Sequence, residues 1–268
     1  MSLSRKAISR LLKAGVVLAL VAAVTLPMLF GGGARTAVGS GFSTDHFRCY
    51  QVQAQTFKAR QVTLVDQFQT DKATAIRAVT LCNPTSKQFP GQTFVLQPQN
   101  PDAHLLCYTI KSKPNIGQRT VVIANQLEQT TVTVLRSESL CLPTLKNQEI
   151  DHNNPEDVLD HFKCYAIRSR SNLNQTVFLD DQFGSWTTTI IKPYLLCNPV
   201  AKTFVTAAGV VHQTQILHPS DHLVCYRTED KNPFTPLTVT THNQFETNSL
   251  IVKKPISLCV PSLKTELP

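Results

Sequence analysis

Short runs of apolar residues alternate with polar stretches along most of the chain. The runs are rich in Val, Ile, Leu and Thr, and turn-forming residues bound them at intervals of about 8–12 positions, which is typical of consecutive β-strands. Representative runs occupy residues 62–65, 120–123, 187–191 and 237–240. Beyond residue 40 no window keeps the period of an amphipathic helix, apart from a single turn expected near residues 155–159. The pattern predicts an all-β fold.

The first forty residues follow a different pattern. Four basic residues between positions 5 and 13 precede an uncharged apolar run over residues 14–30, which is the layout of an export signal. The run is longer than a usual signal-peptide core and shorter than the roughly 20 residues of a comfortable membrane span. We expect residues 1–40 to be a signal peptide or an N-terminal anchor, with contact to a membrane only through residues 14–30 if the leader stays uncleaved. The remaining chain is then exported to the periplasm, the cell surface or the extracellular space.

Four copies of one pattern make up the rest of the sequence. Each copy begins His-x-x-Cys-Tyr, passes through an apolar run to Asp/Asn-Gln-Phe/Leu, and closes with Leu-Cys-x-Pro-x-x-Lys. The copies begin at His46, His104, His161 and His222, their central glutamines are Gln67, Gln126, Gln182 and Gln244, and their closing lysines are Lys87, Lys146, Lys202 and Lys264. Agreement at so many offsets indicates repeated duplication of one unit.

The segments between the copies group them into two pairs. Apolar stretches that predict extra strands connect the first copy to the second and the third to the fourth, whereas the segment between the second and third copies is polar, acidic and broken by proline. The sequence therefore predicts two tandem disulfide-stapled β-sandwich or barrel-like domains, each built from two pseudo-symmetric repeats. Their expected bounds are residues 43–147 and 156–266, with a linker at residues 148–155.

The full signature, D-H-x-x-C-Y … D/N-Q-F … L-C-x-P-x-x-K, resembles that of an uncharacterised family of secreted bacterial repeat domains, a domain of unknown function. The resemblance covers roughly residues 45–264. It implies export and a disulfide-bonded β module, and it carries no known activity and no catalytic residues. The chain departs from the signature at Ala103, where the acid before the second histidine is missing.

Cysteines occupy equivalent positions in every copy. They are Cys49, Cys82, Cys107, Cys141, Cys164, Cys197, Cys225 and Cys259. An even number of cysteines in an exported chain predicts disulfides, and the simplest scheme that can recur joins the two cysteines of each copy. Each such bridge contributes about 3–4 kcal/mol in the chain-entropy view. A crossed pairing within each pair of copies remains the alternative.

Zinc binding competes with disulfides, because each copy offers imidazole and sulfur ligands. On a strand, however, Cys49 shares a face with Phe47, while His46 lies on the opposite face with Tyr50, so the two ligands diverge. The same alternation separates the groups of a Cys–His catalytic dyad. We predict no catalytic residue, no bound metal and no cofactor. The repeated histidine is expected to pack on the tyrosine, and the aspartate before it to close a turn.

The repeated glutamines are expected to be buried amides that satisfy backbone groups at strand ends. Contact residues for a partner are expected instead in loops that differ between the copies, such as those of Trp186 and Phe234.

Charge excludes one class of partner. The formal net charge is +8, but five of the 26 lysines and arginines lie in residues 1–40, where there is no acid, so 21 basic residues face 18 acidic ones in the remainder. A net charge of +3 with no basic run predicts no nucleic-acid binding. The sequence indicates an exported, non-catalytic interaction or structural module that contacts an unknown protein or polymer at the cell surface. The alternatives are a secreted hydrolase or redox enzyme that uses the repeated His and Cys residues, or a zinc-binding module.

Overall fold

The structure is a computed structural model that describes residues 41–147, 154–206 and 208–268. The expected leader at residues 1–40 and most of the expected linker lie outside these ranges. The described residues form fifteen strands and one short 3-10 helix, so the all-β prediction is confirmed. In chain order these elements are β1 (Phe47–Ala54), β2 (Arg60–Val65), β3 (Thr70–Pro84), β4 (Ser86–Gln88), β5 (His104–Lys113), β6 (Arg119–Ala124), β7 (Gln129–Lys146), η1 (Pro155–Asp157), β8 (Phe162–Arg168), β9 (Gln175–Asp181), β10 (Gly184–Pro199), β11 (Ala201–Val205), β12 (Val211–Gln213), β13 (His222–Asp230), β14 (Leu237–His242) and β15 (Thr247–Glu266). Among these residues no helix has the length and apolar character of a membrane span.

Each copy of the repeat contributes three main strands. The His-x-x-Cys-Tyr motif starts a first strand (β1, β5, β8 and β13), a middle strand follows (β2, β6, β9 and β14), and a long closing strand ends in Leu-Cys-x-Pro (β3, β7, β10 and β15). The closing strand pairs with the middle strand along its first half and with the first strand of its own copy along its second half. The second pairing sets the two cysteines of each copy directly opposite one another. The disulfides are Cys49–Cys82, Cys107–Cys141, Cys164–Cys197 and Cys225–Cys259, which is the in-copy scheme.

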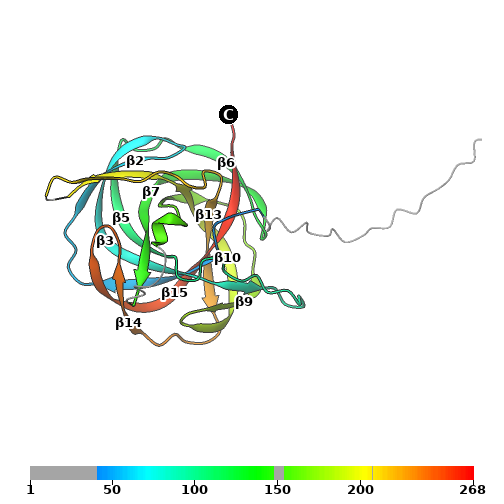
Figure 1. Ribbon diagram of the computed structural model, residues 1–268. Helices are drawn as coiled ribbons and strands as arrows, with labels where there is room; N and C mark the ends of the chain where they lie inside the picture. Colours follow the sequence, from blue (N-terminus) through cyan, green and yellow to red (C-terminus); the bar gives the residue numbers. More distant parts are fainter. Residues whose placement is uncertain (1–40, 148–153, 207) are drawn as a thin grey trace, which may run out of the picture. The chain divides into compact units, whose positions relative to one another are not determined.

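The closing strand of each copy also pairs with the first strand of the next copy. These links are β3–β5, β7–β8, β10–β13 and, from the fourth copy back to the first, β15–β1. Eight antiparallel strands therefore form a closed ring in the order β1-β3-β5-β7-β8-β10-β13-β15. Figure 1 shows strands such as β3, β5 and β15 curving around this ring. Each link between copies contains two register shifts, and such irregularities bend a strand and increase its twist.

The disulfides lie inside this ring. One buried cluster takes a residue from each of the eight strands and contains all four disulfides together with the apolar residue that follows each histidine, such as Phe47 and Phe162. The repeated tyrosines lie on the other face of the same strands and belong to two larger clusters outside the ring. The alternation expected from the sequence, with Cys49 beside Phe47 and opposite Tyr50, is therefore the one that the strands adopt.

The end of each copy crosses to a copy two positions away. The segment after the second cysteine pairs with a middle strand, as β4 with β9, the end of β7 with β14, β11 with β2, and the end of β15 with β6. The first copy thus interlocks with the third, and the second with the fourth. The fifteen strands belong to one continuous sheet, and its residues form one compact unit. The structure does not divide into the two separate tandem domains that the sequence suggested, because the tails of each expected domain pair with middle strands of the other.

This exchange predicts how fragments of the chain behave. Residues 41–147 and 154–268, produced separately in an oxidising host, are expected to stay unfolded, since each half lacks half of the ring and the tails that complete its middle strands. Produced together, the halves should associate without a covalent link. Near-ultraviolet circular dichroism and size-exclusion chromatography measure both outcomes.

A matched control keeps the whole chain and introduces a protease site within residues 148–153. The cleaved protein should elute as one particle and should unfold in a single transition. Two halves that fold and elute independently would contradict the interlocked sheet.

Candidate functional site

The repeated tyrosines bind polar side chains of the copy two positions away. The four pairs are Tyr50–Asp181, Tyr165–Asp66, Tyr108–Asn243 and Tyr226–Asn125. Where the partner is a carboxylate, the tyrosine hydroxyl donates, over 2.7 Å from Tyr50 and 2.6 Å from Tyr165. Where the partner is an amide, its Nδ2 donates to the hydroxyl, as from Asn125 to Tyr226 over 2.9 Å. The tyrosine and the Asp/Asn of the repeat are therefore one structural device that ties alternate copies together.

The Asp/Asn side chain has a second role in its own loop. Oδ1 of Asp66 accepts hydrogen bonds from the backbone N–H groups of Phe68 and Gln69, at 2.9 and 3.0 Å. In the other copies the backbone N–H groups of Leu127, Phe183 and Phe245 donate in the same way to Oδ1 of the Asp or Asn two positions earlier. A short side chain that bonds its own backbone two residues later stabilises a tight turn between two strands. This explains why the motif requires Asp or Asn before the glutamine.

The closing lysines extend to the loop of the next copy, in two alternating ways. Lys87 donates from Nζ to Oε1 of Gln126 at 2.5 Å, and Lys202 donates in the same manner to Gln244. Lys202 Nζ also lies over the loop phenylalanine, 4.9 Å from the ring centre of Phe245. The lysines of the other two copies make this second contact too, with Lys264 Nζ 3.9 Å from the ring centre of Phe68 and Lys146 Nζ 4.4 Å from that of Phe183. These two lysines also donate to an asparagine of the preceding copy, Lys146 to Asn83 and Lys264 to Asn198.

The four glutamines therefore do not share one environment, although they share one position in the repeat. Gln126 and Gln244 are half-buried and accept from a lysine. Gln67 and Gln182 are exposed, and their amides donate to the backbone carbonyls of Pro219 and Pro101. The expectation of a buried amide that satisfies backbone groups describes neither pair: the first pair is half-buried and bonds side chains, and the second bonds backbone carbonyls but is exposed.

All four repeated histidines are buried. At least three of them, His46, His161 and His222, lie close to the lysine of their own copy. Burial lowers the pKa of His46 and His161 well below 6.5, and the neighbouring ammonium groups of Lys87 and Lys202 lower it further. Burial, together with Lys264, lowers the pKa of His222 to about 3. These imidazoles are neutral at physiological pH.

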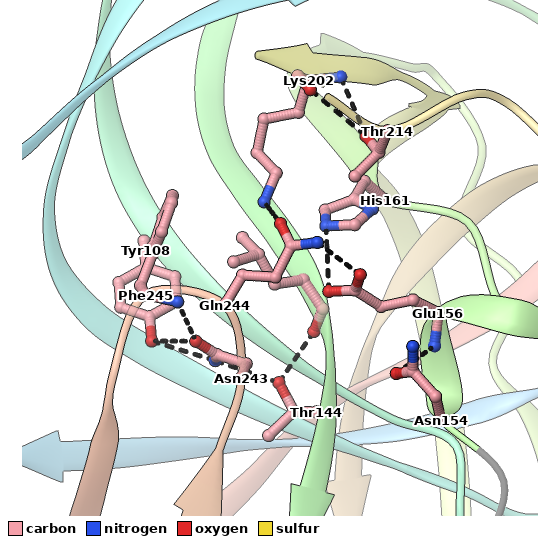
Figure 2. A network of polar contacts seen from close by, with 11 residues as sticks. Tyr108, Thr144, Asn154, Glu156, His161, Lys202, Thr214, Asn243, Gln244 and Phe245 are labelled. Atoms are coloured by element: carbon pink, nitrogen blue, oxygen red, sulfur yellow. Dashed lines mark hydrogen bonds and ion pairs between the residues drawn. The ribbon is translucent and has the colours of Figure 1, made fainter. Parts of the chain in front are cut away.

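An acid joins this arrangement in the third copy. Figure 2 shows the carboxylate of Glu156, from η1, between His161 and Gln244. The amide of Gln244 donates to Glu156, and Oε1 of Glu156 lies 3.9 Å from Nε2 of His161. Burial raises the pKa of the Glu156 carboxyl, against the lowering effect of the Lys202 ammonium. Beside this cluster lies an open pocket of about 270 Å³, whose walls include His212 and His242.

Sequence reasoning missed Glu156, because the acid has no counterpart in the other copies and lies at the edge of the segment expected to be a linker. The pocket holds no ready metal centre: across residues 41–147, 154–206 and 208–268 no three His, Cys, Asp or Glu side chains converge on a common point. All eight cysteines are in disulfides and offer no thiolate to zinc or to a substrate.

The aspartate before the histidine caps a segment of another part of the chain rather than its own turn. Oδ1 of Asp45 accepts from the backbone of Gln99 at 2.7 Å, and Oδ2 accepts from Asn100 at 2.8 Å. Asp160 accepts from Leu217 and His218, and Asp221 accepts from Ser43 and Thr44.

The departure at Ala103 now has a physical reason. Asp221 accepts hydrogen bonds from the two backbone N–H groups that lie three and two positions before His46. The N–H groups at the same positions before His161 are those of Val158 and Leu159. Both donate to the carbonyl of Pro155 within η1. Because the backbone supplies the acceptor there, no carboxylate is needed at Ala103.

The two predicted contact residues lie in one aromatic cluster. The guanidinium of Arg48 lies 4.1 Å from the ring centre of Trp186, and the ring of Phe234 lies 5.2 Å from that of Tyr50. Trp186 and Phe234 are both half-buried, with 6.1 Å between their rings. They contribute to packing, and their contact with a partner stays a prediction.

Comparison with known proteins places the chain in a family. A family model described as a repeat of unknown function, DUF7450, matches residues 104–261. The chain belongs to this family. The match begins at the first histidine of the second copy and ends at the proline that closes the fourth, so its limits are those of the repeat. No curated protein and no solved structure matches the chain significantly.

The buried lysines predict a pH dependence of stability. Burial lowers the pKa of Lys87 and Lys202 to about 7 and that of Lys264 to about 8, whereas a lysine in an unfolded chain titrates near ~10.4. Between these values the unfolded chain binds more protons than the folded one, so the free energy of unfolding should rise as the pH increases from about 7 to about 9. Urea denaturation at a series of pH values measures the slope.

The double variant Lys87→Met and Lys202→Met should show a smaller slope, because two of the three titrating groups are gone. The matched substitution Lys192→Met, at an exposed lysine, should leave the slope unchanged. A flat profile for the native protein over this range would show that the lysines are charged in the folded state.

Proposed function

We propose that the protein is an exported, non-catalytic interaction module that contacts a partner through surface positions at which its four copies differ. Four disulfides indicate an oxidising, extracytoplasmic environment, since reducing compartments keep thiols free. The family description carries no activity.

One observation carries the proposal: the repeated histidines, tyrosines and cysteines are buried, and the tyrosines and cysteines form the bonds that hold the fold together. The histidines that begin the copies are at most 6% exposed, and the tyrosines of the same motif are fully buried. The tyrosines hydrogen-bond alternate copies, and the cysteines form the bridges inside the ring. A general base or a nucleophile must reach its substrate, and groups in these positions have no access to one.

The environment of Glu156 favours the second candidate, a hydrolase. A carboxylate, a neutral imidazole and a lysine of pKa about 7 lie together beside an open pocket, and such perturbed groups are frequent in active sites. The chain offers a direct comparison, because His46 and Lys87 of the first copy form the same kind of set with Gln126 of the second copy.

An experiment separates the two candidates. The protein from residue 41 onward is tested against peptide, ester and glycan substrates and against an array of extracellular polymers and proteins. We expect binding without turnover. The variant Tyr165→Phe, which removes the hydroxyl that donates to the carboxylate of Asp66, should lose about 1–3 kcal/mol of stability and keep its binding.

The variants Glu156→Gln and His161→Asn test the hydrolase directly, with His46→Asn as the matched change in the first copy. Turnover by the native protein that disappears with Glu156→Gln and His161→Asn but persists with His46→Asn, all three being folded, would overturn the proposal.

A further inference from the structure

One solvent-facing part of the sheet gathers positive charge from three distant segments of the chain. An open groove of about 920 Å³ crosses β2, β3, β5 and β11, and its basic residues are Lys58, Arg60, Lys72, Lys111 and Lys113. We name these five residues the basic face. No aspartate or glutamate is among the residues that line the groove. Since the sequence spreads these residues over more than fifty positions, it shows no basic run, and only the strand pairing brings them together.

The register of the strands places like charges side by side. Lys72 of β3 lies directly opposite Lys113 of β5, and Lys111 lies two residues along the same strand, opposite Thr74. Like charges in directly opposed positions destabilise an antiparallel pair. All four lysines of the basic face are exposed, and none of them forms an ion pair within the part of the chain that the structure describes. Folding therefore gains nothing from this cluster.

The repeat itself does not require the cluster either. Lys72 precedes the second cysteine of its copy by ten residues, and Thr187 has that position in the third copy. Lys111 follows the first cysteine of the second copy by four residues, and Glu229 has that position in the fourth. The corresponding strands β10 and β13 pair in the same way, with Thr189 opposite Glu229. The fold is thus compatible with a face that is not basic, and the charge is particular to the first and second copies.

The neutral lining of the groove indicates which anion would fit. Between the cations lie hydroxyl and amide side chains, those of Gln61, Thr63, Thr74, Ser112 and Thr203. Thr203, Thr63, Lys72 and Lys113 form one row across four strands. The aromatic residue of the lining, Phe204, is buried and offers no exposed ring on which a base could stack. Alternating cations and hydrogen-bonding groups match a chain that carries both carboxylates and hydroxyls.

We propose that the basic face binds an acidic polysaccharide, with the ammonium groups of Lys72, Lys111 and Lys113 on its carboxylates and the threonine and glutamine side chains on its hydroxyls. The inference rests on the proposed function, since it names the partner of the interaction module. The groove is open along the sheet, which suits an extended polymer rather than an enclosed small molecule.

The test measures the affinity of the protein from residue 41 onward for polygalacturonate by biolayer interferometry at low and at physiological salt. The triple variant Lys72→Gln, Lys111→Gln and Lys113→Gln should bind at least about tenfold more weakly, because three charge-assisted contacts are lost. Its melting temperature should stay equal or rise, because the repulsion between Lys72 and Lys113 is removed. A purely structural role of these lysines would lower it.

A control variant removes the same charge elsewhere. Lys192→Gln, Lys231→Gln and Lys254→Gln change three exposed lysines outside the groove and should leave the affinity within about twofold of the native value. Equal losses in the two triple variants would mean attraction by net charge alone and would overturn the inference. Tighter binding to single-stranded DNA than to polygalacturonate, or equal binding to uncharged dextran, would overturn it as well.

The failures of the two proposals are distinguishable. If no acidic polysaccharide binds while another partner on the array does, the basic face is not its site and the interaction module stands. If the native protein turns over a substrate through Glu156 and His161, the proposed function itself is wrong.

Discussion

Closure of eight strands into a ring imposes the constraint on which the rest of this structure depends. A ring of this size has an interior just wide enough for side chains, and the outward face of each strand must then be covered by something else. The interior is filled by four disulfides and the apolar residue after each histidine. With the cysteines paired inside, the tyrosine after the first cysteine of each copy turns outward and needs both an apolar neighbourhood and a partner for its hydroxyl.

The copy two positions away meets both needs. It supplies the Asp or Asn that bonds the tyrosine hydroxyl, and its tail adds a strand to the outer layer. The buried ion pair between Lys163 and Asp71, at 2.8 Å with neither side chain exposed, joins the third copy to the first in the same way. A buried charge that loses its partner is strongly destabilising, so these pairs disfavour other alignments of the copies. The contacts between copies two positions apart therefore both repeat around the ring and favour one alignment of the copies.

A scaffold of this kind leaves its functional surface to positions where the copies are free to differ. Two such places stand out among the described residues, and neither is repeated in the copy two positions away. Glu156 adds an acid to one His–Lys–Gln set, and the basic face concentrates unpaired lysines on the strands of the first two copies. The second is the stronger indication of binding, because the Glu156 carboxylate has protein partners whereas the exposed lysines have none among these residues.

The sequence alone determined the local elements of this protein. Offsets between Cys, Gln and Lys gave the repeat, β-branched runs gave the strands, and strict alternation assigned Cys49 and Tyr50 to opposite faces, because these properties depend only on neighbours along the chain. The tertiary structure decided which copies touch. The repeated motif does not reveal that the tails of the first and third copies exchange, since pairing between strands depends on register and on closure of the ring. For the same reason Glu156 and the basic face escaped sequence reasoning: a cluster of Lys72, Lys111 and Lys113 exists only once β3 and β5 lie side by side.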